Sequence, residues 1–166
     1  MVEVKRTKYA GILDNDMVDG DGIVVSFWVQ GCPIRCHGCQ NPQTWIADHG
    51  YDLPDNYLDL IDEKMDANGI KRNFSLLGGE PFATYNLDLS LSVVQHVKEK
   101  FPDRTVYCWT GYYLKDLLLR EEPEVKEILK YIDILVDGPF EMELRDTSLY
   151  LRGSQNQTIN FKGRDF

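Results

Sequence analysis

The chain has 166 residues, 43% of them hydrophobic and 27% charged, which is enough for one domain with a sizeable core and too few for two ordinary ones. Lysine and arginine number 18 and aspartate and glutamate 27, so the formal net charge is −9. Because phosphate backbones repel an acidic chain, we expect no nucleic acid as a partner. The N-terminus has no apolar signal core and no apolar run approaches membrane-spanning length, so a cytoplasmic protein without membrane contact is expected.

Strand-like and helix-like segments alternate along the chain. Runs rich in β-branched and aromatic residues predict strands over 23–29, 73–77, 105–109 and 132–136, with a short one at 159–161. Apolar residues at helical spacing predict helices over 57–65, 87–101, 114–119 and 124–130. Asn68-Gly69 is the expected end of the first helix and Asn86 the expected N-cap of the second.

This alternation predicts an α/β fold with a mostly parallel sheet flanked by helices. A complete eight-stranded barrel needs at least about 200 residues. We therefore expect an open, incomplete TIM-type barrel, formed as a single domain over residues 1–166.

Three of the four cysteines lie within eight residues, directly after the first predicted strand. Their spacing is Cys32-x₃-Cys36-x₂-Cys39, and soft thiolates suit an iron–sulfur cluster, zinc or copper(I). Three ligands without a fourth fit a four-iron cluster with one iron left open. A zinc site that uses His37 as fourth ligand remains an alternative. Cys108 lies in an apolar predicted strand and is expected to be a buried thiol rather than a ligand.

Other notable residues also follow strands. Gly78-Gly79-Glu80-Pro81 comes after the second predicted strand, Thr110-Gly111 after the third and Asp137-Gly138 after the fourth. The carboxyl ends of parallel strands share one edge of a sheet, where ligands bind. The cysteines are therefore expected to face the Gly-Gly-Glu turn across that edge.

The cysteine spacing and the Gly-Gly-Glu-Pro turn together resemble the signature of the radical S-adenosylmethionine superfamily. This resemblance implies a [4Fe-4S] cluster on Cys32, Cys36 and Cys39, whose open iron chelates the amino and carboxylate groups of S-adenosylmethionine. It also implies that Gly78, Gly79 and Glu80 receive the methionine amino group, which a carboxylate can pair with. An electron from the cluster would then split the sulfonium into methionine and a 5′-deoxyadenosyl radical.

Further stretches resemble the glycyl-radical activases that act on anaerobic ribonucleoside-triphosphate reductases. They extend in order from about residue 18 to 157 and comprise Val18-Asp19-Gly20-Asp21-Gly22, Asn41-Pro42-Gln43-Thr44-Trp45, Trp109-Thr110-Gly111-Tyr112, Leu135-Val136-Asp137-Gly138-Pro139-Phe140 and Leu151-Arg152-Gly153-Ser154-Gln155-Asn156-Gln157. The implied reaction abstracts a hydrogen atom from one glycine of an anaerobic (class III) reductase. A reduced electron donor such as flavodoxin is implied as well. By the same resemblance, Thr110 and Asp137 lie where the S-adenosylmethionine carboxylate and a bound cation are held.

Two other readings of the function remain open. One is another small enzyme of the superfamily, such as a pyruvate formate-lyase activase or a 7-carboxy-7-deazaguanine synthase. The other is a zinc-stabilised interaction module without catalysis.

The chain departs from its relatives' usual pattern in two places. Many superfamily members have an aromatic residue against the adenine just before the third cysteine, where this chain has Gly38. Adenine packing is therefore expected to come from elsewhere in the chain. Many activases also have Gly-Pro-Gly where this chain reads Gly20-Asp21-Gly22, and both versions are expected to form a turn.

Overall fold

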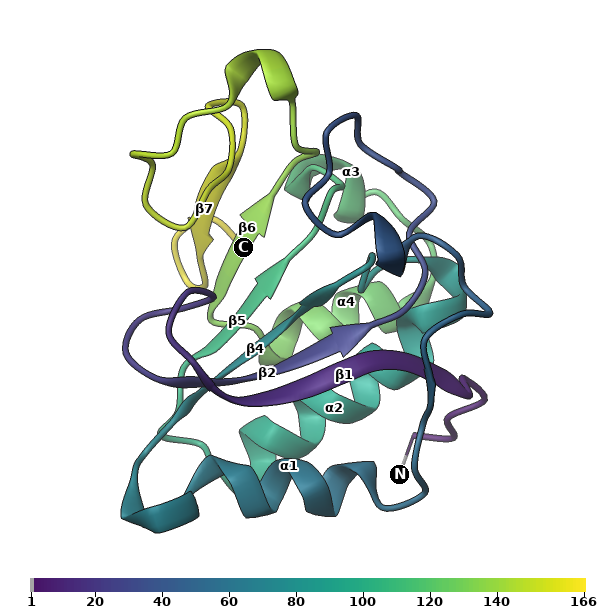
Figure 1. Cartoon of the computed structure of the whole chain (residues 1–166), viewed down its shortest axis with the longest axis vertical. Helices are drawn as coiled ribbons and strands as arrows, with labels where there is room; N and C mark the ends of the chain where they lie inside the picture. The colour runs from purple at the N-terminus through teal and green to yellow at the C-terminus, as the bar shows by residue number, and fades with distance from the viewer. Residues whose placement is uncertain (1) are drawn as a thin grey trace.

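The structure, a computed structural model that describes residues 2–166, is built on a seven-stranded sheet in the order β3-β1-β2-β4-β5-β6-β7 (Figure 1). The four central strands run parallel and are β2 (Val24–Val29), β4 (Asn73–Gly78), β5 (Val106–Trp109) and β6 (Ile134–Asp137). Antiparallel strands extend both sides of this group: β1 (Lys8–Asp16), β3 (Tyr51–Asp52) and β7 (Thr158–Phe161). The predicted α/β class with a mostly parallel sheet flanked by helices is confirmed.

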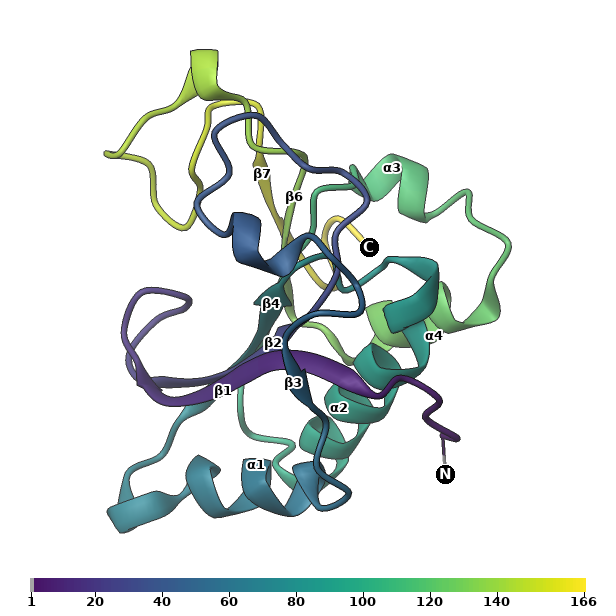
Figure 2. The ribbon, with the colours of Figure 1, turned by 45° about the vertical axis from the view of Figure 1, so that its right-hand side comes forward.

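Three helices cover one face of the sheet. They are α1 (Tyr57–Met65), α2 (Leu87–Lys100) and α4 (Pro123–Tyr131), and Figures 1 and 2 show them on the same side. A fourth helix, α3 (Leu114–Leu117), follows β5, and the 3-10 turns are Pro42–Thr44, Ala67–Gly69, Thr84–Asn86 and Met142–Leu144. No helix within residues 2–166 is both long and apolar enough to cross a bilayer.

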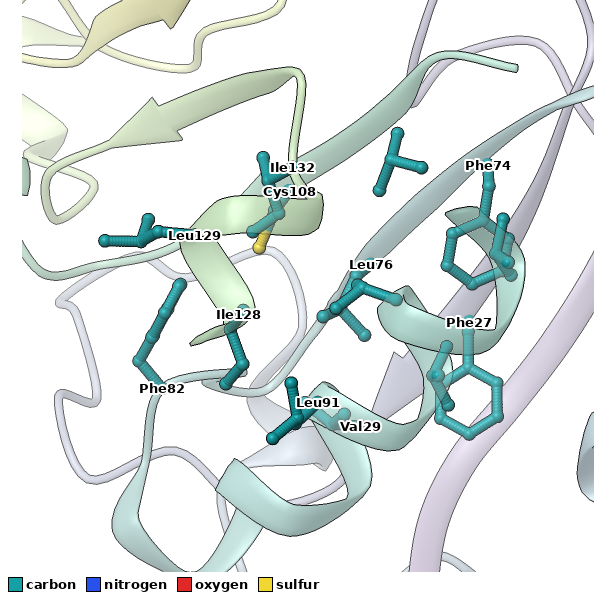
Figure 3. Close-up of a cluster of buried hydrophobic side chains, with 14 of the residues drawn as sticks. Phe27, Val29, Phe74, Leu76, Phe82, Leu91, Cys108, Ile128, Leu129 and Ile132 are labelled. Carbon is teal, nitrogen blue, oxygen red and sulfur yellow. The ribbon is translucent and has the colours of Figure 1, made fainter. Parts of the chain in front are cut away.

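The hydrophobic core lies between the sheet and these helices. Because side chains alternate across a strand, Phe27 and Leu76 point toward the helices while their neighbours point away (Figure 3). Cys108 is fully buried in this core beside Leu129 and Ile132, as predicted for a structural thiol. The opposite face of the sheet is consequently left to line the candidate site.

Two strands at one side of the sheet were not predicted, β1 and β3. The register of β1 against β2 shifts twice, between Tyr9 and Gly11 and again between Leu13 and Asp16. These irregularities break the period-two alternation that identifies a strand from sequence. β3 has only two residues, both exposed, and carries no pattern of its own.

The ends of two helices also differ from the prediction. α1 ends at Met65, and Asn68 (φ 58°) and Gly69 (φ 70°) form a separate left-handed turn just beyond it. Asn86 directly precedes α2, but its side chain makes no capping hydrogen bond. Its amide instead donates to the Gln30 and Glu80 carbonyl oxygens at 3.0 and 3.1 Å. A residue that looks like a helix cap therefore connects the ends of β2 and β4.

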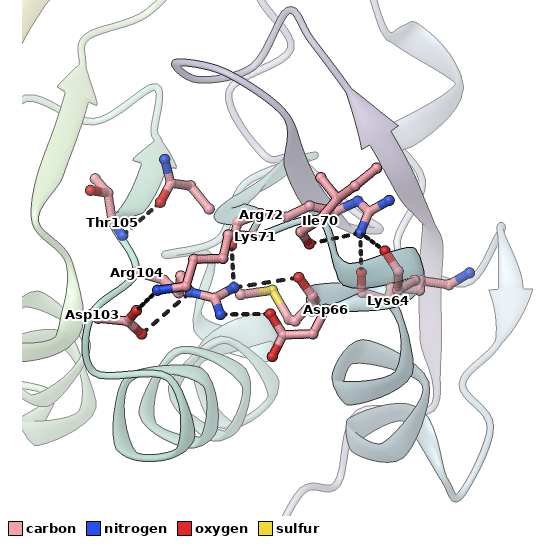
Figure 4. Close-up of polar contacts among 11 residues, drawn as sticks. Lys64, Asp66, Ile70, Lys71, Arg72, Asp103, Arg104 and Thr105 are labelled. Atoms are coloured by element: carbon pink, nitrogen blue, oxygen red, sulfur yellow. Dashed lines mark hydrogen bonds and ion pairs between the residues drawn. The ribbon is translucent and has the colours of Figure 1, made fainter.

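Two buried arginines, Arg72 and Arg104, lie at the amino ends of the parallel strands β4 and β5 (Figure 4). Arg72 Nη1 donates to the Lys64, Ala67 and Ile70 carbonyl oxygens, which lie at and just beyond the end of α1. Arg104 Nη2 pairs with Asp66 Oδ1 at 2.6 Å. Both arginines directly precede a parallel strand, β4 or β5, so this charge cluster joins the end of α1 to the amino ends of these strands.

Candidate active site

A cavity of about 930 Å³ opens where β2, β4 and β5 end. Its wall includes seven of the eight residues predicted for the site: Cys32, Cys36, Cys39, Gly78, Gly79, Glu80 and Thr110. Ligand pockets are commonly about 300 to 1,000 Å³, so the space suits a small cofactor together with a cosubstrate. The shared edge of the parallel strands thus brings these residues into one cavity.

The cysteine loop is held by hydrogen bonds between its two ends. Gly31 N donates to the Thr44 carbonyl oxygen at 2.7 Å, and Cys32 N donates to that of Trp45 at 3.0 Å. The buried Gln30 side chain donates to the Gln43 and Ile46 carbonyl oxygens, each at 2.9 Å. These contacts fix the base of the loop, while the three cysteines above it are free thiols and only partly buried.

The thiols are not arranged around a single point. Among residues 2–166, no three histidine, cysteine or acidic side chains stand close enough to hold one metal ion. A four-iron cluster takes each thiolate on a different iron, so it does not require the sulfurs to converge. Burial raises the pKa of the Cys32 and Cys36 thiols, and nearby backbone amides, including that of Phe140 beside Cys36, act in the opposite direction.

Gly79 lets two strand ends approach each other. Its N–H donates to the Val29 carbonyl oxygen at 2.9 Å, and Glu80 N donates to that of Gly31 at 2.8 Å. A Cβ at Gly79 would lie only 2.3 Å from the Gly31 oxygen. Glycine at this position is thus required by the contact between the β4 turn and the start of the cysteine loop.

Glu80 is 1% exposed and has three donors from the protein. Its Oε1 accepts hydrogen bonds from Phe82 N (3.0 Å) and the Thr110 hydroxyl (2.6 Å), and its Oε2 accepts one from Gly111 N (2.7 Å). Burial raises the pKa of Glu80 to about 7, although these donors oppose the shift. Each carboxylate oxygen has two acceptor sites, so Oε2 has capacity for one more donor.

Thr110 and Asp137 occupy different surroundings. The Thr110 hydroxyl is committed to Glu80 and also accepts from Tyr112 N at 3.1 Å. Asp137 is not among the described residues that line the cavity; its carboxylate accepts from Leu114 N (2.7 Å) and Thr158 N (3.2 Å). Asp137 therefore connects the start of α3 to β7, and the structure does not bring it to the cysteines.

Three acidic residues without a role predicted from sequence line the cavity, Asp14, Asp16 and Asp19. Asp16 is 8% exposed; its Oδ1 accepts from Val18 N and Asp19 N, while its Oδ2 has no hydrogen-bond donor among the described residues. Asp19 carries a pKa raised to about 7, first by burial and then by the adjacent Asp16. Asp16 ends β1, a strand that was not predicted, and Asp19 lies in the stretch 18–22 that resembles the activases without an assigned role.

The residues present fit an iron–sulfur cluster with a polar cosubstrate. Thiolates are the usual ligands of such clusters, and three of them line one cavity. The same wall contains a buried donor without a partner among residues 2–166, Trp45 Nε1. Buried polar groups are normally paired, so this free N–H indicates room for a ligand with polar atoms.

Comparison with known proteins gives concordant findings. A family model described as a 4Fe-4S single cluster domain matches residues 18–160. Curated relatives named anaerobic ribonucleoside-triphosphate reductase-activating protein include those of Vibrio cholerae (38% identity, 87% of this chain and 92% of the relative) and Pasteurella multocida (36%, 91% and 95%). The Escherichia coli K12 protein of that name is 34% identical over 87% of this chain and 92% of its own length.

Proposed function

The chain belongs to the family of anaerobic ribonucleoside-triphosphate reductase-activating proteins, and we propose that it is a radical S-adenosylmethionine enzyme that generates a glycyl radical on such a reductase. The observation that carries this proposal is the shared cavity of the three cysteines and the Gly78–Glu80 turn. When bound, a reduced [4Fe-4S] cluster supplies the electron that cleaves the sulfonium, and the nucleoside radical so released takes a hydrogen atom from the reductase glycine.

In this proposal the chain's own residues have separate tasks. Cys32, Cys36 and Cys39 hold three irons from a loop whose base is fixed. Glu80 receives the methionine ammonium at Oε2, the oxygen that accepts only one hydrogen bond. An ammonium at that oxygen favours the ionised carboxylate and offsets the effect of burial on its pKa.

The roles of Thr110 and Asp137 toward the carboxylate and a cation remain predictions from the resemblance. The Thr110 hydroxyl donates its one proton to Glu80 Oε1, so its observed contact orients Glu80 and adds no donor for the methionine carboxylate. Asp137 is not among the described residues that line the cavity, and its carboxylate accepts from Leu114 N and Thr158 N, so the geometry adds no support to its prediction.

We propose further that the sheet is an incomplete TIM-type barrel and that residues 1–166 form one domain. The four parallel strands with helices on one face support the barrel, and the single cluster of buried residues supports the domain. An open-sided sheet suits a protein substrate, because a loop of the reductase can then reach the cavity. The electron would come from a reduced donor such as flavodoxin.

Anaerobic reconstitution tests this function. We expect a brown protein that holds iron and sulfide, cleaves S-adenosylmethionine after reduction and produces a glycyl radical, seen by electron paramagnetic resonance, on an anaerobic ribonucleotide reductase. A colourless protein with one zinc ion would reject the enzyme. Cleavage without a radical on that reductase would instead favour another small enzyme of the superfamily.

Single cysteine variants test the ligand set. Cys32→Ala, Cys36→Ala and Cys39→Ala should each abolish reductive cleavage, because three thiolates are needed to anchor the cluster and leave one iron open. Cys108→Ala is the matched control and should retain cleavage, since its sulfur is fully buried on the helix side of the sheet. Loss of the cluster in Cys108→Ala would overturn the assignment.

A further inference from the structure

Side chains of the stretch Leu151–Gln157, which resembles the activases, bind the backbone of the segment that follows β6. Gln157 Oε1 accepts from Gly153 N (2.8 Å) and Ser154 N (3.2 Å), and its Nε2 donates to the Gly138 carbonyl oxygen (3.0 Å). Asn156 Nδ2 donates to the Pro139 carbonyl oxygen at 2.7 Å.

Ser154 adds one more hydrogen bond, and we call the side chains of Ser154, Asn156 and Gln157 the clamp. The hydroxyl of Ser154, which is fully buried, accepts from Glu141 N at 3.1 Å. Backbone groups at 138, 139 and 141 are therefore all held by side chains of 154–157. The residue between them, Phe140, is fixed on both sides.

The clamp places the Phe140 ring between two glycines. A Cβ at Gly153 would lie 3.1 Å from Phe140 Cδ2, and one at Gly38 would lie 3.5 Å from Phe140 Cε1. A Cβ at Gly38 would also lie 2.3 Å from the Met142 methyl carbon. Residues 140–142 therefore pack directly over Gly38. Phe140 thus borders the cysteine loop and lines the cavity, and its backbone amide faces Cys36.

We propose that Phe140 packs against the purine of the nucleoside cosubstrate and that Ser154, Asn156 and Gln157 position it; this inference rests on the function proposed above. A purine requires an apolar or aromatic surface within reach of the cluster. Three other aromatic residues line the wall, Trp28, Trp45 and Trp109. Trp109 already stacks on Tyr107, and Phe140 is the ring that borders Gly38, the residue before the third cysteine.

The affinity of the reconstituted, unreduced protein tests this role, because no cleavage occurs and binding alone is measured. Stacking of a base on an aromatic ring predicts that Phe140→Ala weakens S-adenosylmethionine binding by about fivefold to a hundredfold in anaerobic calorimetry. S-methylmethionine, which has the sulfonium and amino acid but no nucleoside, should bind both proteins equally. Phe140→Tyr keeps the ring and should stay within about twofold of the wild type.

Two further variants keep the test decisive. Phe140→Leu retains apolar volume without the ring, so it replaces Phe140→Ala if the latter loses iron or sulfide, and it should still weaken binding at least about fivefold. Phe161→Ala removes an aromatic ring on β7, outside the cavity wall, and should leave affinity unchanged. Equal affinity of wild type and Phe140→Leu, or equal losses for both ligands, would overturn the inference.

A double variant tests whether the clamp residue Gln157 acts through Phe140. Gln157→Ala should weaken S-adenosylmethionine binding in the wild-type background and have little additional effect when combined with Phe140→Ala, because it acts through that ring. Additive losses would remove Gln157 from this role. If the wild type itself does not bind S-adenosylmethionine, the proposed function fails; if it binds and the Phe140 variants bind equally well, only this inference fails.

Discussion

At the scale of single residues, Gly79 and Gly111 show how closely two strand ends meet. Neither has a φ in the left-handed region, so an added methyl group matters only through what it meets. At Gly79 it would meet backbone atoms of Gly31, the nearest at 2.3 Å, whereas at Gly111 its nearest neighbour is the terminal methyl of Ile34 at 2.4 Å. A terminal methyl can rotate away, but backbone hydrogen-bonded in a loop cannot.

We therefore expect Gly79→Ala to lower the free energy of unfolding by about 3 kcal/mol and Gly111→Ala by about 1 kcal/mol. Chemical denaturation of the cluster-free protein measures both. Equal losses in the two variants would show that the approach of Gly79 to the cysteine loop is not the constraint described.

Asp19 gives the protein a pH-dependent stability. Its pKa is raised from 3.8 to about 7 in the folded chain, so between these values the folded state retains a proton that the unfolded state releases. The contribution of Asp19 is fully present below about pH 4 and is lost as the pH rises through about 7.

Asp19→Asn removes this titration while keeping the side-chain shape. Relative to the wild type, the variant should be more stable at pH 8 than at pH 5, measured as the difference in thermal unfolding midpoint. A difference that is the same at both pH values would contradict the raised pKa.

At the scale of elements, the start of α2 is tied to two strand ends rather than capped. Asn86 is fully buried, donates to two carbonyl oxygens and accepts from Arg6 Nε at 2.9 Å. A capping role would tolerate aspartate, which is among the best N-caps. A carboxylate, however, cannot donate to the Gln30 and Glu80 carbonyl oxygens.

Asn86→Asp should accordingly lower the free energy of unfolding by at least about 2 kcal/mol, because two buried acceptors then face a negative charge. Asn86→Ala serves as the comparison and should lose no more than the aspartate variant. An aspartate variant as stable as the wild type would restore the capping interpretation.

At the scale of the whole molecule, segments far apart in sequence enclose the cavity. Asp21, in the turn between β1 and β2, accepts hydrogen bonds from the Tyr107 hydroxyl at 3.0 Å and from that of Tyr150. It thereby connects that turn to β5 and to the C-terminal segment. The cysteine loop forms another part of the wall.

Because a cluster binds only the folded arrangement of the three cysteines, loading it should raise the unfolding temperature. Each kcal/mol of added stability corresponds to about 2 to 4 °C for a chain of this size. Anaerobic thermal unfolding with and without the cluster measures the rise, which Cys108→Ala should keep and Cys36→Ala should lose. An unchanged midpoint in the wild type would argue against a bound cluster.

Sequence alone predicted the strands, helices and cysteine motif whose residue patterns lie within one short segment. The β-branched runs predicted the four central strands, the apolar spacing predicted α1, α2 and α4, and the run of Cys32, Cys36 and Cys39 indicated cluster chemistry before any geometry was known. The common edge of parallel strands brought Glu80 to these cysteines, as the alternation of strands and helices predicted.

Tertiary structure decided what depends on contacts between distant segments. Irregular pairing hid β1, and the partners of Asn86 and Asp137 lie on other elements, so a sequence cannot separate a cap or turn residue from a connector. The surface beside Gly38 comes from Phe140 and Met142, about a hundred residues later in the chain. Packing across such separations has no periodic trace in sequence, because it is set by where whole elements dock.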